Sequence, residues 1–143
     1  MNEKHMQHGE DWCGEMIAGW IATEKFNGCR AYWDGVNLWS RGGIAAQIPQ
    51  SWRDALPPIP LDCELYDGID GVYRCGAALR YGRFTGSMRL MVFDAPACVG
   101  PWVDRMDIAR LQREFIQASK SMSKTADRIE QLMGSAPALR RAI

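Results

Sequence analysis

Two β-forming runs flank the dipeptide Asn27-Gly28, and this arrangement constrains the fold of the 143-residue chain more than any other feature. Asn-Gly between such runs is a strong signal for a β-hairpin closed by a type I′ turn. The runs at 17–25 and 29–34 are therefore predicted to be its paired strands. Asp34-Gly35 is a second turn signal, and the other apolar runs predict strands at 36–40, 61–66 and 89–94.

Helical patterns lie between and after these strands. Gln50 to Leu56 predicts a helical turn that Pro57 ends, and 77–81 predicts a short helix between two glycines. From Val103 onward, apolar residues recur at three- and four-residue steps, as on one face of a helix. A second helical stretch surrounds Ile129, Leu132 and Met133. We therefore predict an α+β fold: an antiparallel-sheet-rich domain over 17–103, preceded by a mobile segment 1–16 and followed by a helical tail 104–143.

Composition excludes several kinds of site. Lys+Arg and Asp+Glu number 17 each, and this zero net charge argues against a strongly electrostatic DNA clamp. Five cysteines without C-x-x-C spacing indicate neither a zinc site nor a disulfide framework, and His5 and His8 lack the acidic or thiol neighbours of a metal site. The chain has no apolar run near ~18 residues, so we expect a cytoplasmic protein with no membrane contact.

Residues 25–30 have the pattern K-x-x-G-x-R, which combines a candidate nucleophile, Lys25, with a candidate anion-binding residue, Arg30. A lysine amine is nucleophilic only when neutral, which requires burial or cationic neighbours. Gly28 allows the backbone to approach a bulky ligand closely, and Arg30 can hold an anion with two parallel hydrogen bonds.

Three further strings follow in order. Arg41 precedes Gly42-Gly43, where it is either an anion-binding residue or part of an ordinary surface turn. Glu64 lies in the middle of an apolar strand, where an unpaired carboxylate is costly to bury. Asp62 alternates onto the same face, so one of the two acids is alternatively a solvated edge residue. Phe93 ends another apolar strand and is either a stacking platform or a core residue.

Taken together, these strings resemble the adenylation domain of ATP-dependent DNA ligases, within the covalent nucleotidyltransferase superfamily that includes RNA ligases and capping enzymes. The likeness covers roughly residues 18 to 103 and is greatest to small bacterial and phage ligases, which carry the Arg-Ala-Tyr-Trp-Asp-Gly string that begins at Arg30. Asn27 replaces the usual aspartate of the lysine motif, and Cys63 replaces a usual glycine. The implied fold is a partial, ATP-grasp-like nucleotidyltransferase domain.

The resemblance also implies ligands and roles. Lys25 is expected to attack the α-phosphate of ATP and form lysine-AMP, with Mg²⁺ on the phosphates. Nicked duplex DNA is the expected partner, in DNA repair or replication, with Arg41 on its 5′ phosphate. The remaining nucleotide contacts are expected from Glu24, Arg30, Glu64 and Phe93, and no residue is assigned to a metal.

Two strands of that family have no counterpart in the sequence. After Asp94 there is neither a Glu-Gly-Val strand for a metal ion nor a lysine-rich strand for the phosphates. We therefore expect a truncated domain with impaired adenylation and weak DNA binding. Three alternatives stay open: a catalytically inactive remnant that binds nucleotide or a partner protein, an RNA ligase or capping-type nucleotidyltransferase, and a second chain that supplies the missing half.

Overall fold

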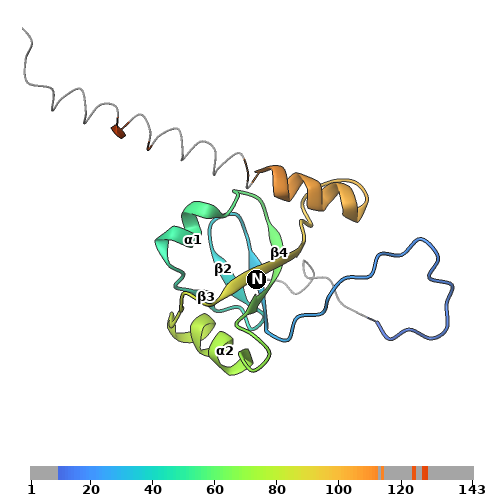
Figure 1. The fold of residues 1–143 in the computed structure, drawn as a ribbon, viewed down its shortest axis with the longest axis horizontal. Coiled ribbons are helices and arrows are strands. Elements are labelled where there is room, and N and C mark those ends of the chain that lie inside the picture. Colours follow the sequence, from blue (N-terminus) through green and yellow to red (C-terminus); the bar gives the residue numbers. More distant parts are fainter. Residues whose placement is uncertain (1–9, 113, 115–123, 125–126, 129–143) are drawn as a thin grey trace, which may run out of the picture.

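The structure, a computed structural model, describes residues 10–112, 114, 124, 127 and 128 (Figure 1). Within these residues the chain forms a five-stranded antiparallel sheet of order β3-β2-β1-β4-β5, which confirms the α+β prediction. The strands are β1 (Cys29–Trp33), β2 (Leu38–Ser40), β3 (Ala45–Ala46), β4 (Leu61–Tyr66) and β5 (Arg89–Asp94). The helices are α1 (Gln50–Ala55), α2 (Val72–Tyr81) and a helix over 102–112.

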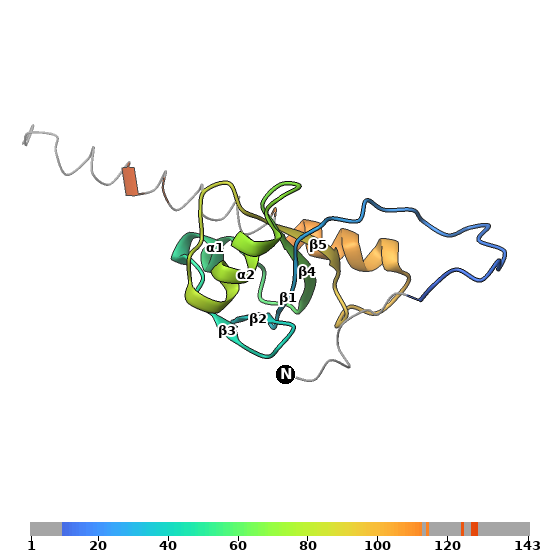
Figure 2. The same ribbon diagram turned by 90° about the horizontal axis from the view of Figure 1, so that it is seen from below.

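One face of the sheet packs against α2 to form the apolar core (Figure 2). Side chains alternate across a strand, so every second residue of β1 and β4 points into this core. Their buried members are Ala31, Trp33, Leu61, Cys63 and Leu65, and α2 contributes Cys75, Ala78 and Leu79. The residues between these buried ones point to the opposite face of β1 and β4, and most of them are polar.

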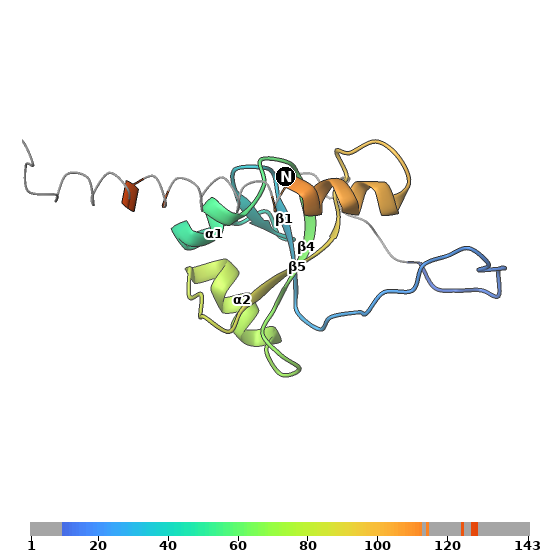
Figure 3. The ribbon, with the colours of Figure 1, turned by 45° about the horizontal axis from the view of Figure 1, so that its top comes forward.

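The predicted hairpin at Asn27-Gly28 is wrong. Residues 17–27 form no strand, and Figure 3 shows the segment before β1 running away from the sheet. Both edges of β1 are already occupied, by β2 and by β4, so a strand at 17–25 has no edge to pair with. Neither residue of the dipeptide has the positive φ that a type I′ turn requires.

The second turn signal, Asp34-Gly35, does close a hairpin between β1 and β2. Gly35 has φ +100°, and the Asp34 carboxylate accepts hydrogen bonds from the amides of Val36 and Asn37 and from the indole of Trp39. Burial disfavours the charged form of this carboxyl, but the hydrogen bonds outweigh burial and lower the pKa of Asp34. This hairpin fixes where β2, and the turn after it, lie against β1.

The helices depart from the sequence predictions in length. The α1 helix ends before Pro57, as predicted, whereas α2 spans ten residues because Gly76 lies inside the helix and does not end it. Gly82, with φ +69°, caps α2 instead. The helix over 102–112 begins one residue before the predicted start, and the stretch around Ile129, together with His5 and His8, lies outside the described residues. Among the described helices, none is long and apolar enough to cross a membrane.

Candidate functional site

The polar face of the sheet gathers the candidate side chains of β1 and β4. Arg30 pairs in register with Glu64 across the two antiparallel strands, and Asp62 lies two residues before Glu64 on the same face. Strand β4 is flanked by both β1 and β5, so the alternative that one of the two acids is a solvated edge residue is wrong. Asp62 is only 1% exposed.

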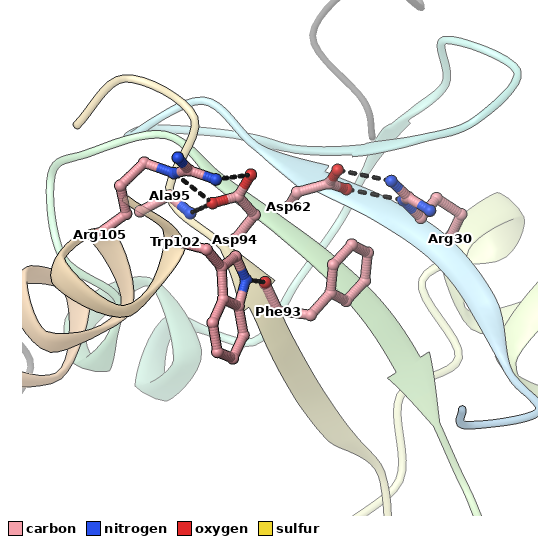
Figure 4. Close-up of polar contacts among 7 residues, drawn as sticks. All are labelled: Arg30, Asp62, Phe93, Asp94, Ala95, Trp102 and Arg105. Atoms are coloured by element: carbon pink, nitrogen blue, oxygen red, sulfur yellow. Dashed lines mark hydrogen bonds and ion pairs between the residues drawn. The ribbon is translucent and has the colours of Figure 1, made fainter. Parts of the chain in front are cut away.

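Arg30 and Asp62 form a two-pronged ion pair (Figure 4). The distances are 2.7 Å from Nε to Oδ1 and 2.5 Å from Nη2 to Oδ2. The Arg30 side chain is 25% exposed, so most of the pair is shielded from water. The sequence assigned the Arg30 guanidinium to an anionic ligand, but here it compensates a buried carboxylate of its own chain.

The same guanidinium lies over the ring of Phe93, with Cζ 4.4 Å from the ring centroid (Figure 4). This is the geometry of a cation–π contact. The register between β4 and β5 shifts at Asp62 and Cys63, so that Phe93 is the additional residue on β5. The bulge presents its half-buried ring outside the apolar core, so the alternative of an ordinary core residue does not hold.

The end of β5 is fixed from the helix over 102–112 (Figure 4). The Trp102 indole donates to the Phe93 carbonyl oxygen at 2.6 Å. Arg105 donates from Nε to Asp94 Oδ1 at 2.8 Å and from Nη2 to Oδ2 at 3.1 Å. The helix therefore holds the backbone at Phe93 and the side chain of Asp94, although no local sequence pattern pointed to Trp102 or Arg105.

Glu64 is half-buried, and its Oε1 accepts a hydrogen bond from the Gly28 amide at 3.1 Å. Burial raises the pKa of Glu64, while the Gly28 amide and the charges of Arg30 and Lys25 act in the opposite direction. Because its pKa is raised, this carboxyl stabilises the fold at low pH. The contribution is lost as the pH rises through the pKa that Glu64 has in the folded protein. Further donors from a ligand would favour the ionised form, so the site suits a hydroxyl-bearing molecule.

Gly28 is required by packing against β4. A Cβ at this position would lie 2.0 Å from the Leu65 carbonyl oxygen, closer than any side chain tolerates. The close approach that the sequence assigned to a ligand is therefore made to a neighbouring strand.

Gly28→Ala is expected to lower the free energy of unfolding by about 1–3 kcal/mol, the usual cost of an extra methyl group in a packed site. Gly86→Ala is the matched control, because a Cβ there meets nothing within 4 Å. Thermal unfolding of the two variants measures the difference, and equal melting temperatures would contradict the steric argument.

The remaining candidates lie at the surface. Lys25 and Glu24 are exposed, so of the two conditions that activate a lysine amine, burial is not met at Lys25. Lys25 lies close enough to Glu64 for its charge to act on that carboxyl. Arg41 is exposed in the turn between β2 and β3, where the Ser40 hydroxyl accepts from the Ile44 amide.

An open cleft of about 520 Å³ brings Arg30, Arg41 and Glu64 to one place. Lys25, Glu24 and Phe93 are not among its lining residues. All five cysteines are free thiols, and burial raises the pKa of Cys75 to about 11. Within the described part of the chain, no three His, Cys, Asp or Glu side chains gather into a metal-binding group.

Known proteins resemble this chain over part of their length. A DNA ligase from Haemophilus influenzae is 28% identical over 103 residues, which are 71% of this chain and 38% of the relative. A solved Lig E DNA ligase, described in a structure-function analysis of DNA binding with a minimal scaffold, superposes with a TM-score of 0.56 at 24% identity. The superposition covers 64% of this chain and 38% of that one.

No protein family model matches the chain. Both similar proteins are DNA ligases, and this chain covers about 38% of the length of each. The chain therefore carries a DNA ligase-like partial domain. The likeness to the solved ligase is a likeness of fold, and in this chain that fold is a five-stranded antiparallel sheet with few helices.

Proposed function

We propose that this chain is the nucleotide-binding part of an ATP-dependent DNA ligase, which forms lysine-AMP on Lys25 for the sealing of nicks in duplex DNA. The observation that carries the proposal is the polar face of the sheet, where Arg30, Glu64 and Phe93 meet on three adjacent strands. The DNA ligase relative supplies independent support. DNA repair and replication in the cytoplasm are the processes that such a reaction serves.

The proposed chemistry has three transfers. The neutral Lys25 amine attacks the α-phosphorus of ATP, the bond to the β-phosphate breaks, pyrophosphate leaves, and the amine gives its proton to solvent. AMP then passes from the lysine to the 5′ phosphate of a nicked strand. Finally, the 3′ hydroxyl attacks that phosphate, joins the strands and releases AMP.

Each candidate residue has a binding role in this scheme. Glu64 accepts hydrogen bonds from the ribose hydroxyls, because a half-buried carboxylate is stabilised by hydrogen-bond donors. Phe93 stacks on the adenine, and Arg30, held by Asp62, keeps the ring in place. Arg41 binds the 5′ phosphate of the DNA, and Glu24 borders the nucleotide beside the nucleophile. Magnesium accompanies the triphosphate of ATP; no three His, Cys, Asp or Glu side chains gather among the described residues, and no residue is assigned to the ion.

The exposure of Lys25 favours a second candidate function. Burial is one of the two conditions that activate a lysine amine, and the exposed Lys25 lacks it, so residues 1–143 alone are expected to bind nucleotide with little or no turnover. A second chain that encloses the amine would convert this binding module into an active ligase. An RNA ligase or capping-type enzyme would share the lysine chemistry, but the string at Arg30 to Gly35 is that of the DNA ligases.

Nucleotide binding tests the proposal directly. Phe93→Ala is expected to weaken ATP binding about tenfold, from ~1–3 kcal/mol of lost stacking, and Glu64→Ala to weaken it comparably by removing the ribose acceptor. Tyr73→Ala is the matched aromatic control, since Tyr73 is 88% exposed on α2. Calorimetric titration with ATP and GTP gives the affinities. Equal ATP affinity in all variants would refute the assignment, and a preference for GTP would favour a capping-type enzyme.

A further inference from the structure

The open cleft is built by three segments that lie far apart in the sequence. Residues 28–30 enter and begin β1, residues 40–42 end β2 and start the following turn, and residues 76–80 belong to α2. Its volume of about 520 Å³ falls within the range of small-molecule sites. Glu64 lines it as well, so the cleft adjoins the proposed ribose contact.

Two glycines keep this cleft open without being needed for the fold. Gly76 lies inside α2, where glycine is less favourable than alanine, yet an added Cβ would meet only Cys29 Sγ at 3.9 Å. A Cβ on Gly42 would come no closer than 4.0 Å to Ser40 Oγ, and Gly42 does not have a positive φ. Neither packing nor backbone conformation explains these glycines, whereas side chains in their places would fill the cleft.

The charges around the cleft favour an anion. Arg30 lines it from β1, Arg41 from the turn after β2 and Arg80 from α2, and Glu64 is the only acidic residue among its lining. Arg30 is paired with Asp62, and Arg41 and Arg80 add two further positive charges to the lining of the cleft. A guanidinium matches the oxygens of a phosphate with two parallel hydrogen bonds.

We infer that Arg80 is a phosphate-binding residue and that, with Arg41, it forms a phosphate subsite in the space that Gly42 and Gly76 leave open. This inference deepens the proposed function, and it rests on that function only for the source of the phosphate. The group belongs either to the triphosphate of a nucleotide or to a DNA strand. The chemistry of recognition is the same for both.

Gly76→Ala separates this subsite from a structural role of the helix. The variant is expected to raise the melting temperature by roughly 4 °C, because alanine favours the helix. It is also expected to weaken phosphate binding at least fivefold, because the methyl group enters the cleft. Two probes are titrated: inorganic tripolyphosphate, and a nicked duplex with a 5′ phosphate. Unchanged affinity for both probes in a stabilised variant would overturn the inference.

Arg80→Ala provides the second test, with Arg83→Ala as its control. Arg83 is exposed three residues along the chain, over the ring of Tyr81, and does not line the cleft. Arg80→Ala is expected to weaken binding of at least one probe about tenfold, and Arg83→Ala to change it less than twofold. A loss of affinity for tripolyphosphate identifies the nucleotide as the source of the bound phosphate, and a loss of affinity for the nicked duplex identifies the DNA strand. Equal losses in both variants would indicate diffuse charge attraction and overturn the inference.

Adenosine distinguishes failure of the subsite from failure of the proposed function. It carries no phosphate, so its affinity is expected to be the same in wild type, Gly76→Ala and Arg80→Ala. Adenosine binding without phosphate binding would reject the subsite alone. Phosphate binding by a wild type that does not bind adenosine would reject the proposed nucleotide site and leave the subsite standing.

Discussion

Replacing Arg30 by glutamine is expected to lower the free energy of unfolding by about 3–5 kcal/mol, the cost of leaving a buried charge without its partner. Asp62 is only 1% exposed, and the two hydrogen bonds from Arg30 compensate its charge. Glutamine retains a donor but no charge. Domains of this size are stable by only about 5–15 kcal/mol, so the loss is a large fraction of the total. Urea unfolding at pH 7 measures it.

The double variant Arg30→Gln with Asp62→Asn is the decisive control. It removes both charges together and retains groups of similar shape, so it is expected to recover much of the stability that the single variant loses. A double variant whose destabilisation equals the sum of the two single changes would show that the pair is not coupled. Arg74→Gln is a matched comparison. The Arg74 side chain is 57% exposed in its ion pair with Asp67, so this substitution should lower the free energy of unfolding far less.

The ion pair connects stability to the proposed site. Arg30 lies between Asp62 and the ring of Phe93, so its loss also removes the cation that orients the ring. From the other side, Trp102 binds the backbone carbonyl of Phe93, and Arg105 binds the carboxylate of the next residue, Asp94. The half-buried ring is therefore positioned by groups from two separate elements. A flat platform held in this way loses little freedom on binding a nucleobase.

Strands and helices with regular apolar patterns could be predicted from the sequence. Strands β4 and β5 were predicted as 61–66 and 89–94 because their residues pack on a core. The hairpin at Asn27-Gly28 was wrong because a turn signal does not reveal that β1 is already paired on both edges. The length of α2 was missed because an isolated glycine, Gly76, weakens the helical pattern without ending the helix.

The site was predictable only where a residue is unusual for its surroundings. Glu64 and Phe93 stood out within apolar strands, and the structure brings both beside Arg30. The ion pairs of Asp62 with Arg30 and of Asp94 with Arg105 could not be predicted, because residues 32 and 11 positions apart leave no local pattern. The roles proposed for Lys25, Glu24 and Arg41 rest on the resemblance to DNA ligases and stay predictions.

Lys25→Ala is expected to abolish any lysine-AMP that residues 1–143 form with labelled ATP and magnesium, and to leave the fold intact. The side chain is exposed, so its removal should change the free energy of unfolding by less than about 0.5 kcal/mol. Lys124→Ala is the matched control, since Lys124 is also an exposed lysine. Denaturing gel electrophoresis of the labelled chain measures the adduct, and treatment with acid should release the AMP because a phosphorus–nitrogen bond is acid-labile.

The wild-type yield then decides between the two candidate functions. The amine is hydrated, whereas lysine nucleophiles are activated by burial or by cationic neighbours, so we expect a low yield and no sealing of nicked duplex. A labelled adduct that Lys25→Ala removes and Lys124→Ala retains would identify the nucleophile of a ligase. A folded chain that binds ATP without any adduct would be a nucleotide-binding module. In the described part of the chain, Lys25 is the only lysine whose charge acts on Glu64. An adduct that persists in Lys25→Ala would therefore lie on a residue away from the proposed nucleotide site and would refute the mechanism.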